Sequence, residues 1–273
     1  MKPSRDNPFP PDRTPSASQR FRRALLPPVE AVALWLPSHL VPRLSRRAAE
    51  RVARHCAPAD ETMARWIDGR FPGILVTAHL GNWELGGQYI ALRGRSMWSV
   101  YRPIGTNRTL VPLLKFRQAT GQHVIAREGA MMGMMRALRQ NSLVAILLDQ
   151  HTDPSDGGFY LDFFGLPAAF SNAAGHIAHR LKVPVGLVGV VHDPDEDRYR
   201  LAIYDEITAE EAAALAPKAI TARIVAGLER MILANPGQWL WVYRRWKRWP
   251  LGDDPARFPF YAVVDRSVAD HPQ

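Results

Sequence analysis

The feature that most limits the possible folds is a series of short apolar runs, which alternate with helical patterns from residue 73 onward. Apolar strands separated by helices are typical of an α/β sheet that is covered on both faces. The polar stretch HDPDEDR joins two adjacent runs and predicts a hairpin, so we expect a mixed, mostly parallel sheet. Strands are predicted at 74–79, 97–102, 123–126, 143–148, 183–191, 199–204 and 239–244, and helices at 83–92, 108–120, 129–140, 171–181 and 208–234.

The chain divides into four predicted regions. Residues 1–19 are charged and rich in Pro and Ser, which predicts a disordered tail and no secretory signal. Residues 20–58 combine arginines with an apolar patch around Trp35 and predict an amphipathic, membrane-associating helical segment, with a helix pair packed on the domain as the alternative. Residues 59–250 are predicted to form the α/β domain, followed by a C-terminal extension at 251–273.

Composition narrows the classes of partner and site. The 273 residues carry a net charge of +9, which favours an anionic partner such as nucleic acid, an anionic bilayer or an acidic carrier. The only cysteine, Cys56, excludes an intrachain disulfide and a thiolate metal cluster. We find no uninterrupted apolar run of about 18 residues, the length that would indicate a transmembrane helix.

The stretch GILVTAHLGNWELGG, residues 73–87, places His79 at the end of a predicted strand and Glu84 five positions later. Open α/β sheets carry their sites at the carboxyl ends of strands. A glutamate in the first turn of the next helix could accept a hydrogen bond from one imidazole nitrogen and leave the other free to take a proton. The alternative is a histidine bonded at a strand end beside a helix-start charge, and the spacing alone favours it. Asn82 suits the cap of that helix.

This stretch and three others occur in the same order as the motifs of a known family. Over about residues 70–250, the sequence resembles the bacterial lipid A biosynthesis acyltransferases, the lauroyl and myristoyl transferases of the lysophospholipid acyltransferase superfamily. It departs from them in a weaker N-terminal hydrophobic anchor and in Tyr243, where a histidine is expected. The four stretches are AHLGNWELGG (78–87), VYRPIGTNRTLVPLLKFRQATGQHVI (100–125), the segment from LVAILLDQHTD to LKVPV (143–185) and QWLWVYRRWKRWP (238–250).

The resemblance implies a glycerol-phosphate-acyltransferase-like fold and a transfer reaction. A fatty acyl group would move from a thioester, on acyl carrier protein or coenzyme A, to a hydroxyl of a glycolipid such as a lipid A precursor. His79 would act as general base and Glu84 would hold its tautomer, and no cofactor or metal would be needed. The protein would lie at the cytoplasmic face of the bacterial inner membrane, peripheral or weakly anchored.

Several other residues are predicted to bind substrate. Arg102 and Arg117 could hold phosphate or a developing oxyanion, with ordinary surface arginines as the alternative. Asp149 and Gln150 follow another predicted strand, where they either face the substrate or, as we slightly favour for Asp149, have a structural role. Asn82 is a further candidate, although a helix cap is favoured for it.

The stretch RRWKRW near residue 245 suggests contact with a membrane or phosphate through Arg244, Arg245, Trp246 and Lys247. The alternative is a solvated strand end with one tryptophan in the core. A rival function for the whole chain is a non-catalytic basic protein that binds anionic membranes or nucleic acid, and it leaves the histidine and glutamate unexplained. Nucleic acid is therefore not expected. Another acceptor, a phosphatidylinositol mannoside or a lysophospholipid, keeps the same chemistry.

Overall fold

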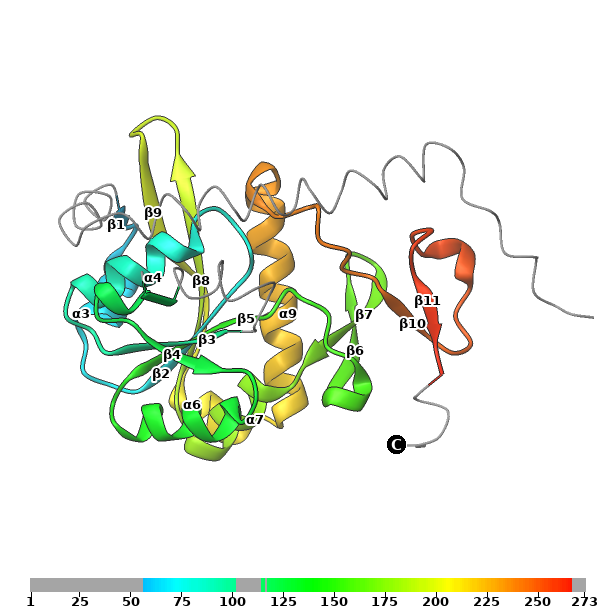
Figure 1. Ribbon diagram of the computed structural model, residues 1–273, viewed down its shortest axis with the longest axis horizontal. Coiled ribbons are helices and arrows are strands. Elements are labelled where there is room, and N and C mark those ends of the chain that lie inside the picture. The colour runs from blue at the N-terminus through cyan, green and yellow to red at the C-terminus, as the bar shows by residue number, and fades with distance from the viewer. Residues whose placement is uncertain (1–55, 102–113, 116, 267–273) are drawn as a thin grey trace, which may run out of the picture.

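The computed structural model describes residues 56–101, 114–115 and 117–266 (Figure 1). The predicted tail at 1–19, nearly all of the predicted segment at 20–58 and the candidate Arg102 lie outside these residues.

A seven-stranded sheet forms the centre of the protein, in the order β1-β9-β8-β2-β5-β3-β4. The strands β8 and β9 pair antiparallel and every other neighbouring pair is parallel, which confirms a mixed, mostly parallel sheet and the predicted hairpin. The strands are β1 (Cys56–Pro58), β2 (Gly73–Thr77), β3 (Met97–Tyr101), β4 (His123–Ala126), β5 (Leu143–Leu147), β8 (Val185–Asp193) and β9 (Arg198–Ile207).

Helices cover both faces of this sheet. Leu75 of β2 packs with α3 and α4, whereas its neighbours Ile74 and Val76 pack with α6, α7 and α9 on the other face. This alternation follows from the two-residue period of a strand. The helices are α3 (Glu61–Asp68), α4 (Trp83–Leu92), α6 (Ala130–Arg139), α7 (Ala173–Leu181), α8 (Ala209–Ala214) and α9 (Pro217–Ala234), with short 3-10 turns η2 (Pro154–Asp156), η3 (Pro236–Gln238) and η4 (Pro255–Arg257).

Two small sheets lie on the right of Figure 1: one of β6 and β7, beside α9, and one of β10 and β11, beyond it. The strands β6 (Gly158–Phe163) and β7 (Leu166–Ser171) pair antiparallel, and β10 (Arg248–Pro250) and β11 (Val263–Asp265) pair parallel. The hairpin of β6 and β7 was not predicted. The strand predicted at 239–244 is wrong, because only Trp239 makes a bridge, to Leu80, before the chain turns.

The helix predicted at 208–234 is divided in two. Thr208 caps α8 with a capping box to Glu211, and Pro217 begins α9. Proline is tolerated in the first turn of a helix but not inside one, so the chain has to start a new helix there.

A β-bulge in β9 turns its last residues to the opposite faces of the sheet. Leu201 and Ile203 pack with α3 and α4, whereas Ile207 packs with the helices on the other face. Without the one-residue shift opposite Leu187 and Val188 in β8, all three side chains would share a face.

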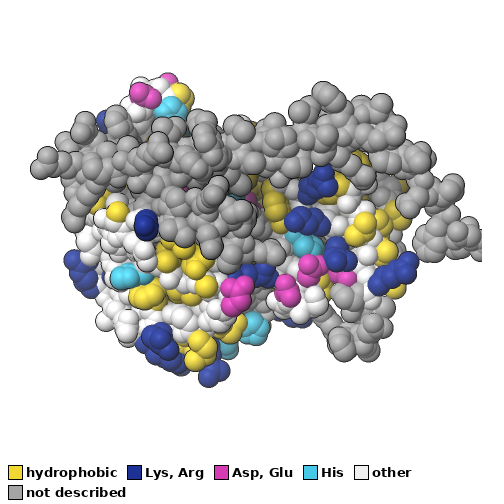
Figure 2. Space-filling model, in the orientation of Figure 1, with side chains coloured by type: hydrophobic (Ala, Val, Ile, Leu, Met, Phe, Trp, Pro, Cys, Tyr) yellow, Lys and Arg dark blue, Asp and Glu magenta, His cyan; other side chains and the backbone are white. Residues whose placement is uncertain are grey.

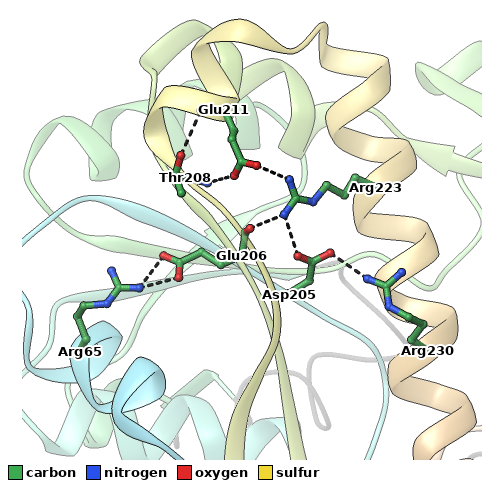
Figure 3. Close-up of polar contacts among 7 residues, drawn as sticks. All are labelled: Arg65, Asp205, Glu206, Thr208, Glu211, Arg223 and Arg230. Carbon is green, nitrogen blue, oxygen red and sulfur yellow. Dashed lines mark hydrogen bonds and ion pairs between the residues drawn. The ribbon is translucent and has the colours of Figure 1, made fainter.

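The acidic residues next to the bulge form ion pairs with arginines of the surrounding helices (Figure 3). Asp205 accepts hydrogen bonds from Arg223 and Arg230 of α9, at 3.0 and 2.9 Å. The carboxylate of the next residue, Glu206, accepts two bonds from Arg65 of α3, at 2.8 and 2.6 Å, and its backbone carbonyl accepts one from Arg223 at 2.7 Å. Arg223 also donates to Glu211 at 2.7 Å. This network therefore joins the end of β9 to helices on both faces.

Within the described residues, we find no helix that is both long and apolar enough to cross a membrane.

Candidate active site

The ends of β2 and β5 bring two side chains together across 70 positions of sequence. The parallel register pairs Gly73 with Leu143 and continues to the pair of Thr77 and Leu147. Two residues further along each strand stand His79 and Asp149, so the register places them opposite each other at the carboxyl edge of the sheet.

Asp149 holds His79 at two points. The carboxylate Oδ1 lies 2.7 Å from the imidazole Nδ1, and Oδ2 accepts the backbone N–H of His79 at 2.9 Å. Oδ2 also accepts the indole N–H of Trp239 at 2.9 Å. The imidazole contacts the ring of Trp83 edge-on, with 4.8 Å between the ring centroids. The imidazole is thus fixed in position and in orientation.

The charge of Asp149 is kept by its hydrogen bonds. Burial of this carboxyl group, which is only 3% exposed, acts to raise its pKa. The bonds and charge interaction with His79 and the bond from Trp239 outweigh burial and lower the pKa below its ordinary value. Asp149 is therefore a carboxylate at neutral pH, and the proton between it and His79 belongs on Nδ1.

The turn after β2 has little freedom. Gly81 has a positive φ of 58°, and a Cβ there would collide with the carbonyl oxygen of Val190. The N–H of Gly81 donates to the carbonyl of Gln238 at 2.8 Å, and the N–H of Leu240 donates to the carbonyl of His79 at 2.9 Å. The backbone on both sides of the imidazole is therefore tied to residues 238–240.

The structure corrects the partner expected for the histidine. The carboxylate of Glu84 pairs with Arg117, whose Nε donates to Oε2 at 2.9 Å and whose Nη2 donates to Oε1. Glu84 makes no hydrogen bond to His79 among the described contacts, and Asp149 takes the position expected for it. The physical reason is that Glu84 lies in the first turn of α4, where the buried guanidinium of Arg117 reaches it from the facing segment.

Three of the residues predicted to bind substrate have other contacts here. Asn82 caps α4 by accepting the N–H of Leu85 at 3.1 Å, as favoured. Arg117 is 7% exposed and its charge is paired with Glu84, so its role as a surface phosphate ligand is not supported. Asp149 is buried against His79 and does not face the solvent. Gln150 does lie at the open side of the site, with its Nε2 3.3 Å from Nε2 of His79.

A narrow cavity of about 40 Å³ lies between α4 and the sheet, beside Trp83 and Glu84. Its walls are mostly apolar, but Ser99 Oγ, Gln122 Oε1 and Arg117 Nη1 have no hydrogen-bond partner among the described residues. A water molecule needs roughly 10–15 Å³ of such volume, so this cavity suits a few waters and not an acyl chain. The helix α4 lies close to the sheet here, because a Cβ at Gly86 would be 2.5 Å from Val190 Cγ2.

The RRWKRW stretch separates into buried and exposed cations. Arg245 is completely buried, over the ring of Phe170 at 3.9 Å, and donates to the carbonyl of Ala169 at 2.8 Å. Its predicted contact with a membrane or phosphate is therefore wrong. Burial lowers the pKa of Arg245 to about 10, which still leaves it charged at neutral pH.

The other three candidates in this stretch keep some exposure. Arg244 and Lys247 are exposed, over the rings of Tyr261 and Tyr243 at 5.5 and 4.6 Å. Trp246 is partly buried against the main core, which corresponds to the alternative of one tryptophan in the core.

A loop after Gln150 joins the site to the C-terminal segment. The backbone N–H of His151 donates to the hydroxyl of Tyr243 at 3.0 Å, and its Nε2 lies 3.2 Å from Asp153. Burial lowers the pKa of His151 and outweighs the effect of Asp153. Tyr243, the residue that departs from the resemblance, thus contacts this loop directly.

No three His, Cys, Asp or Glu side chains are grouped as metal ligands within the described residues. Cys56 is buried in β1, and burial raises the pKa of its thiol to about 12. The thiol is therefore protonated at neutral pH and is a poor nucleophile.

Sequence reasoning missed Trp239, which donates to Asp149 from a segment 90 residues away. A strand pattern in WLWVYR gave no sign of this role, although a tryptophan buried near a site usually has a partner for its N–H.

Comparison with known proteins identifies the family. Residues 63–248 match the family model described as bacterial lipid A biosynthesis acyltransferase. The match covers more than half of the chain, so the chain belongs to the bacterial lipid A biosynthesis acyltransferase family, as the four ordered blocks predicted.

Two relatives in this family are similar over the same region. The chain is 27% identical over 186 residues to the lipid A biosynthesis palmitoleoyltransferase of Escherichia coli (strain K12). It is equally similar to the lipid A biosynthesis acyltransferase of Shigella flexneri, at 27% over 186 residues. Each alignment covers 66% of this chain and 57% of the relative, so the chain matches a little more than half the length of each.

Proposed function

We propose that this protein transfers a fatty acyl group from a thioester to a hydroxyl of a glycolipid such as a lipid A precursor. The observation that carries the proposal is the pair of His79 and Asp149, 2.7 Å apart at the carboxyl edge of the sheet. Membership of the family and the names of both relatives, which refer to lipid A biosynthesis, support the choice of reaction.

His79 is the general base of the proposed reaction. Because Nδ1 donates its proton to Asp149, Nε2 carries a lone pair that accepts the proton of the acceptor hydroxyl. The hydroxyl oxygen attacks the thioester carbonyl, the C–S bond breaks, and the proton passes from Nε2 to the departing sulfur. The Asp149 carboxylate stabilises the imidazolium that exists between these steps. Base catalysis of this kind contributes roughly 10²–10⁴ in rate.

Gln150 is placed to exchange partners during the reaction. Its amide nitrogen is 3.3 Å from Nε2 of His79, the atom that the acceptor hydroxyl needs. When the hydroxyl takes this position, the amide N–H is released and can donate to the carbonyl oxygen as it gains negative charge. Glu84 and Arg117 act beside this site by fixing the start of α4 against the facing segment.

The donor, acceptor and location follow the same proposal. The donor is an acyl thioester on carrier protein, with coenzyme A as the alternative, and the acceptor is held at the cytoplasmic face of the inner membrane. Arg244 and Lys247 are the exposed cations available for lipid phosphate in the closing block. The domain at 59–250 would carry the chemistry, with 20–58 as membrane-associating segment.

The test is acyl transfer from labelled acyl carrier protein to a lipid A precursor, measured with the whole protein. His79→Ala should reduce the rate by about 10²–10⁴. His192→Ala is the control, because His192 lies on the β8–β9 hairpin and, among the described residues, its hydrogen bonds go to that hairpin and to Gln238. A folded His79→Ala variant with undiminished activity would disprove the role of His79.

Mass spectrometry of the lipids that gain an acyl chain identifies the acceptor. Acylation of lysophospholipids or phosphatidylinositol mannosides, with none of lipid A precursors, would keep the mechanism and replace the proposed acceptor.

A further inference from the structure

A groove of about 620 Å³ lies between α6 and α7, away from the catalytic pair. Its volume is within the range of about 300–1,000 Å³ that is usual for binding sites. It combines two methionines with four basic or titratable side chains, namely Met131, Met135, His176, His179, Arg180 and Lys182.

The rim of this groove is cationic, and its cations make no ion pair with described residues. Neither residues 129–148 nor residues 163–192 contain an aspartate or glutamate. Arg180 and Lys182, which line the groove, are exposed, as are Arg136 and Arg139 elsewhere on α6, and none of these four takes part in an ion pair in the described part of the chain. Figure 2 shows Lys, Arg and His side chains along its lower edge, over α6 and α7, with hydrophobic atoms between them.

The floor of the groove is apolar and adaptable. Met131, which lines the groove, is 44% exposed, and this is unusual for a side chain of this kind. Methionine fits irregular partners because its side chain is flexible and polarisable. An apolar floor with basic edges suits an amphipathic helix that carries acidic residues beside its apolar face. A flat anionic bilayer would reach the cations but would leave the floor unfilled.

The groove begins close to the catalytic edge of the sheet. The strand β4 ends at Ala126 and α6 begins at Ala130, so Met131 lies in the turn of α6 nearest that edge. Arg127 pairs with Asp156 at 3.0 Å, and Asp156 belongs to the loop that follows Gln150. A partner in the groove would therefore lie beside the loop that borders His79.

We propose that the groove between α6 and α7 docks an acidic helix of the carrier protein that delivers the acyl thioester. This inference rests on the proposed function, because it names the donor's docking surface. A carrier bound there presents a thioester on its long, flexible prosthetic arm, which reaches His79 around the first turn of α6.

The experiment measures binding of unacylated carrier protein to the whole protein, so that no chemistry is required. Arg180→Glu should weaken binding by about tenfold, because it places a like charge against an acidic partner. Arg70→Glu is the matched control: Arg70 is an exposed arginine before β2 and should change affinity by less than about twofold. Met131→Glu is a second groove variant, and its effect should equal that of Arg180→Glu.

Two results would overturn the inference. One is equal loss of carrier binding in Arg180→Glu and Arg70→Glu, with both variants folded by circular dichroism. The other is reduced binding of Arg180→Glu to vesicles of anionic phospholipid with unchanged binding to the carrier, which would make the groove a bilayer contact. Groove-dependent carrier binding without acyl transfer would instead refute the proposed function and leave the docking surface standing.

Discussion

Two clusters of charged side chains at ends of the central sheet strands are built on different principles. In the network of Asp205 and Glu206, every carboxylate faces one or two arginines, and the side chains lie near the surface (Figure 3). At His79, the buried carboxylate of Asp149 is held by an imidazole, a backbone N–H and an indole, and no arginine is among its hydrogen-bond donors. The first arrangement neutralises charge, whereas the second keeps a carboxylate beside the imidazole that we propose as general base.

The two clusters also differ in whether their buried polar atoms have hydrogen-bond partners. Arg117 Nη1, His151 Nδ1 and two nitrogens of Arg245 are buried around the site without a hydrogen-bond partner among the described residues. No atom of the network at Asp205 is in this group. Buried polar atoms without a partner among the described residues also occur elsewhere, as at Trp66 Nε1 and Arg95 Nε, so what distinguishes the network at Asp205 is that its polar atoms are paired.

The largest difference between the two clusters should come from Asp149→Asn. The amide removes the charge that stabilises imidazolium. Its own N–H also faces one of the three groups that donate to Asp149, namely the ring and backbone N–H of His79 and the indole of Trp239. We therefore expect a loss of acyl transfer on the order of 10²-fold or more. The measurement is the rate of acyl transfer at saturating donor. Trp239→Phe is the companion variant, since it removes one donor and leaves the carboxylate. If Asp149→Asn stays folded and fully active, the site has been assigned to the wrong carboxylate.

A smaller effect is expected from Glu84→Gln. Glu84 does not touch the imidazole, so the loss of activity should be about tenfold or less, and it should come with destabilisation of about 1–3 kcal/mol because Arg117 loses a charged partner. Activity and thermal unfolding are measured on the same preparation. A greater loss of activity than in Asp149→Asn would restore Glu84 as the orienting group.

A substitution in the network of Asp205 and Glu206 should change the stability of the protein and not its activity. Arg223→Ala removes bonds to Asp205 and Glu211, and near-surface ion pairs contribute about 0–1 kcal/mol each, so unfolding in urea should shift slightly. Acyl transfer should remain at the wild-type rate. A drop in transfer equal to that of Asp149→Asn would remove the distinction between the two clusters.

The free energy of unfolding should fall at low pH partly because of Asp149. The pKa of Asp149 is lowered in the folded protein, so its contribution is present above about pH 4, the ordinary pKa, and is lost as pH falls through the folded value. Asp149→Asn should therefore flatten the decline in unfolding free energy below about pH 4. The same decline in both proteins would mean that Asp149 keeps an ordinary pKa.

The sequence predicted the parts of the fold that depend on local pattern. Apolar runs identified β2, β3, β4, β5, β8 and β9, and the residues of the turn after β2 identified His79 and the cap Asn82. The register between β2 and β5 could not be predicted, because the sequences of the two strands do not determine which residues pair. The choice of Glu84 followed from nearness in sequence, and the parallel pairing made Asp149 nearer in space.

The burial of Arg245 and the role of Trp239 were not predicted for a related reason. A run of arginines and tryptophans has the composition of a surface, and the burial of one arginine between phenylalanines depends on the β6–β7 hairpin, which was not predicted. Likewise, WLWVYR alternates like a strand, but its first indole serves as a donor to a residue on another element.

The ties from residues 238–240 to the turn around His79 have a consequence for biosynthesis. A ribosome makes β2 early, yet the turn that follows it is held by Gln238, Trp239 and Leu240, which are added more than 150 positions later. Folding that proceeds from the N-terminus can therefore assemble most of the sheet around an imidazole that is still loosely placed. In a nascent chain, the imidazole would gain its fixed position only when this later segment has been made.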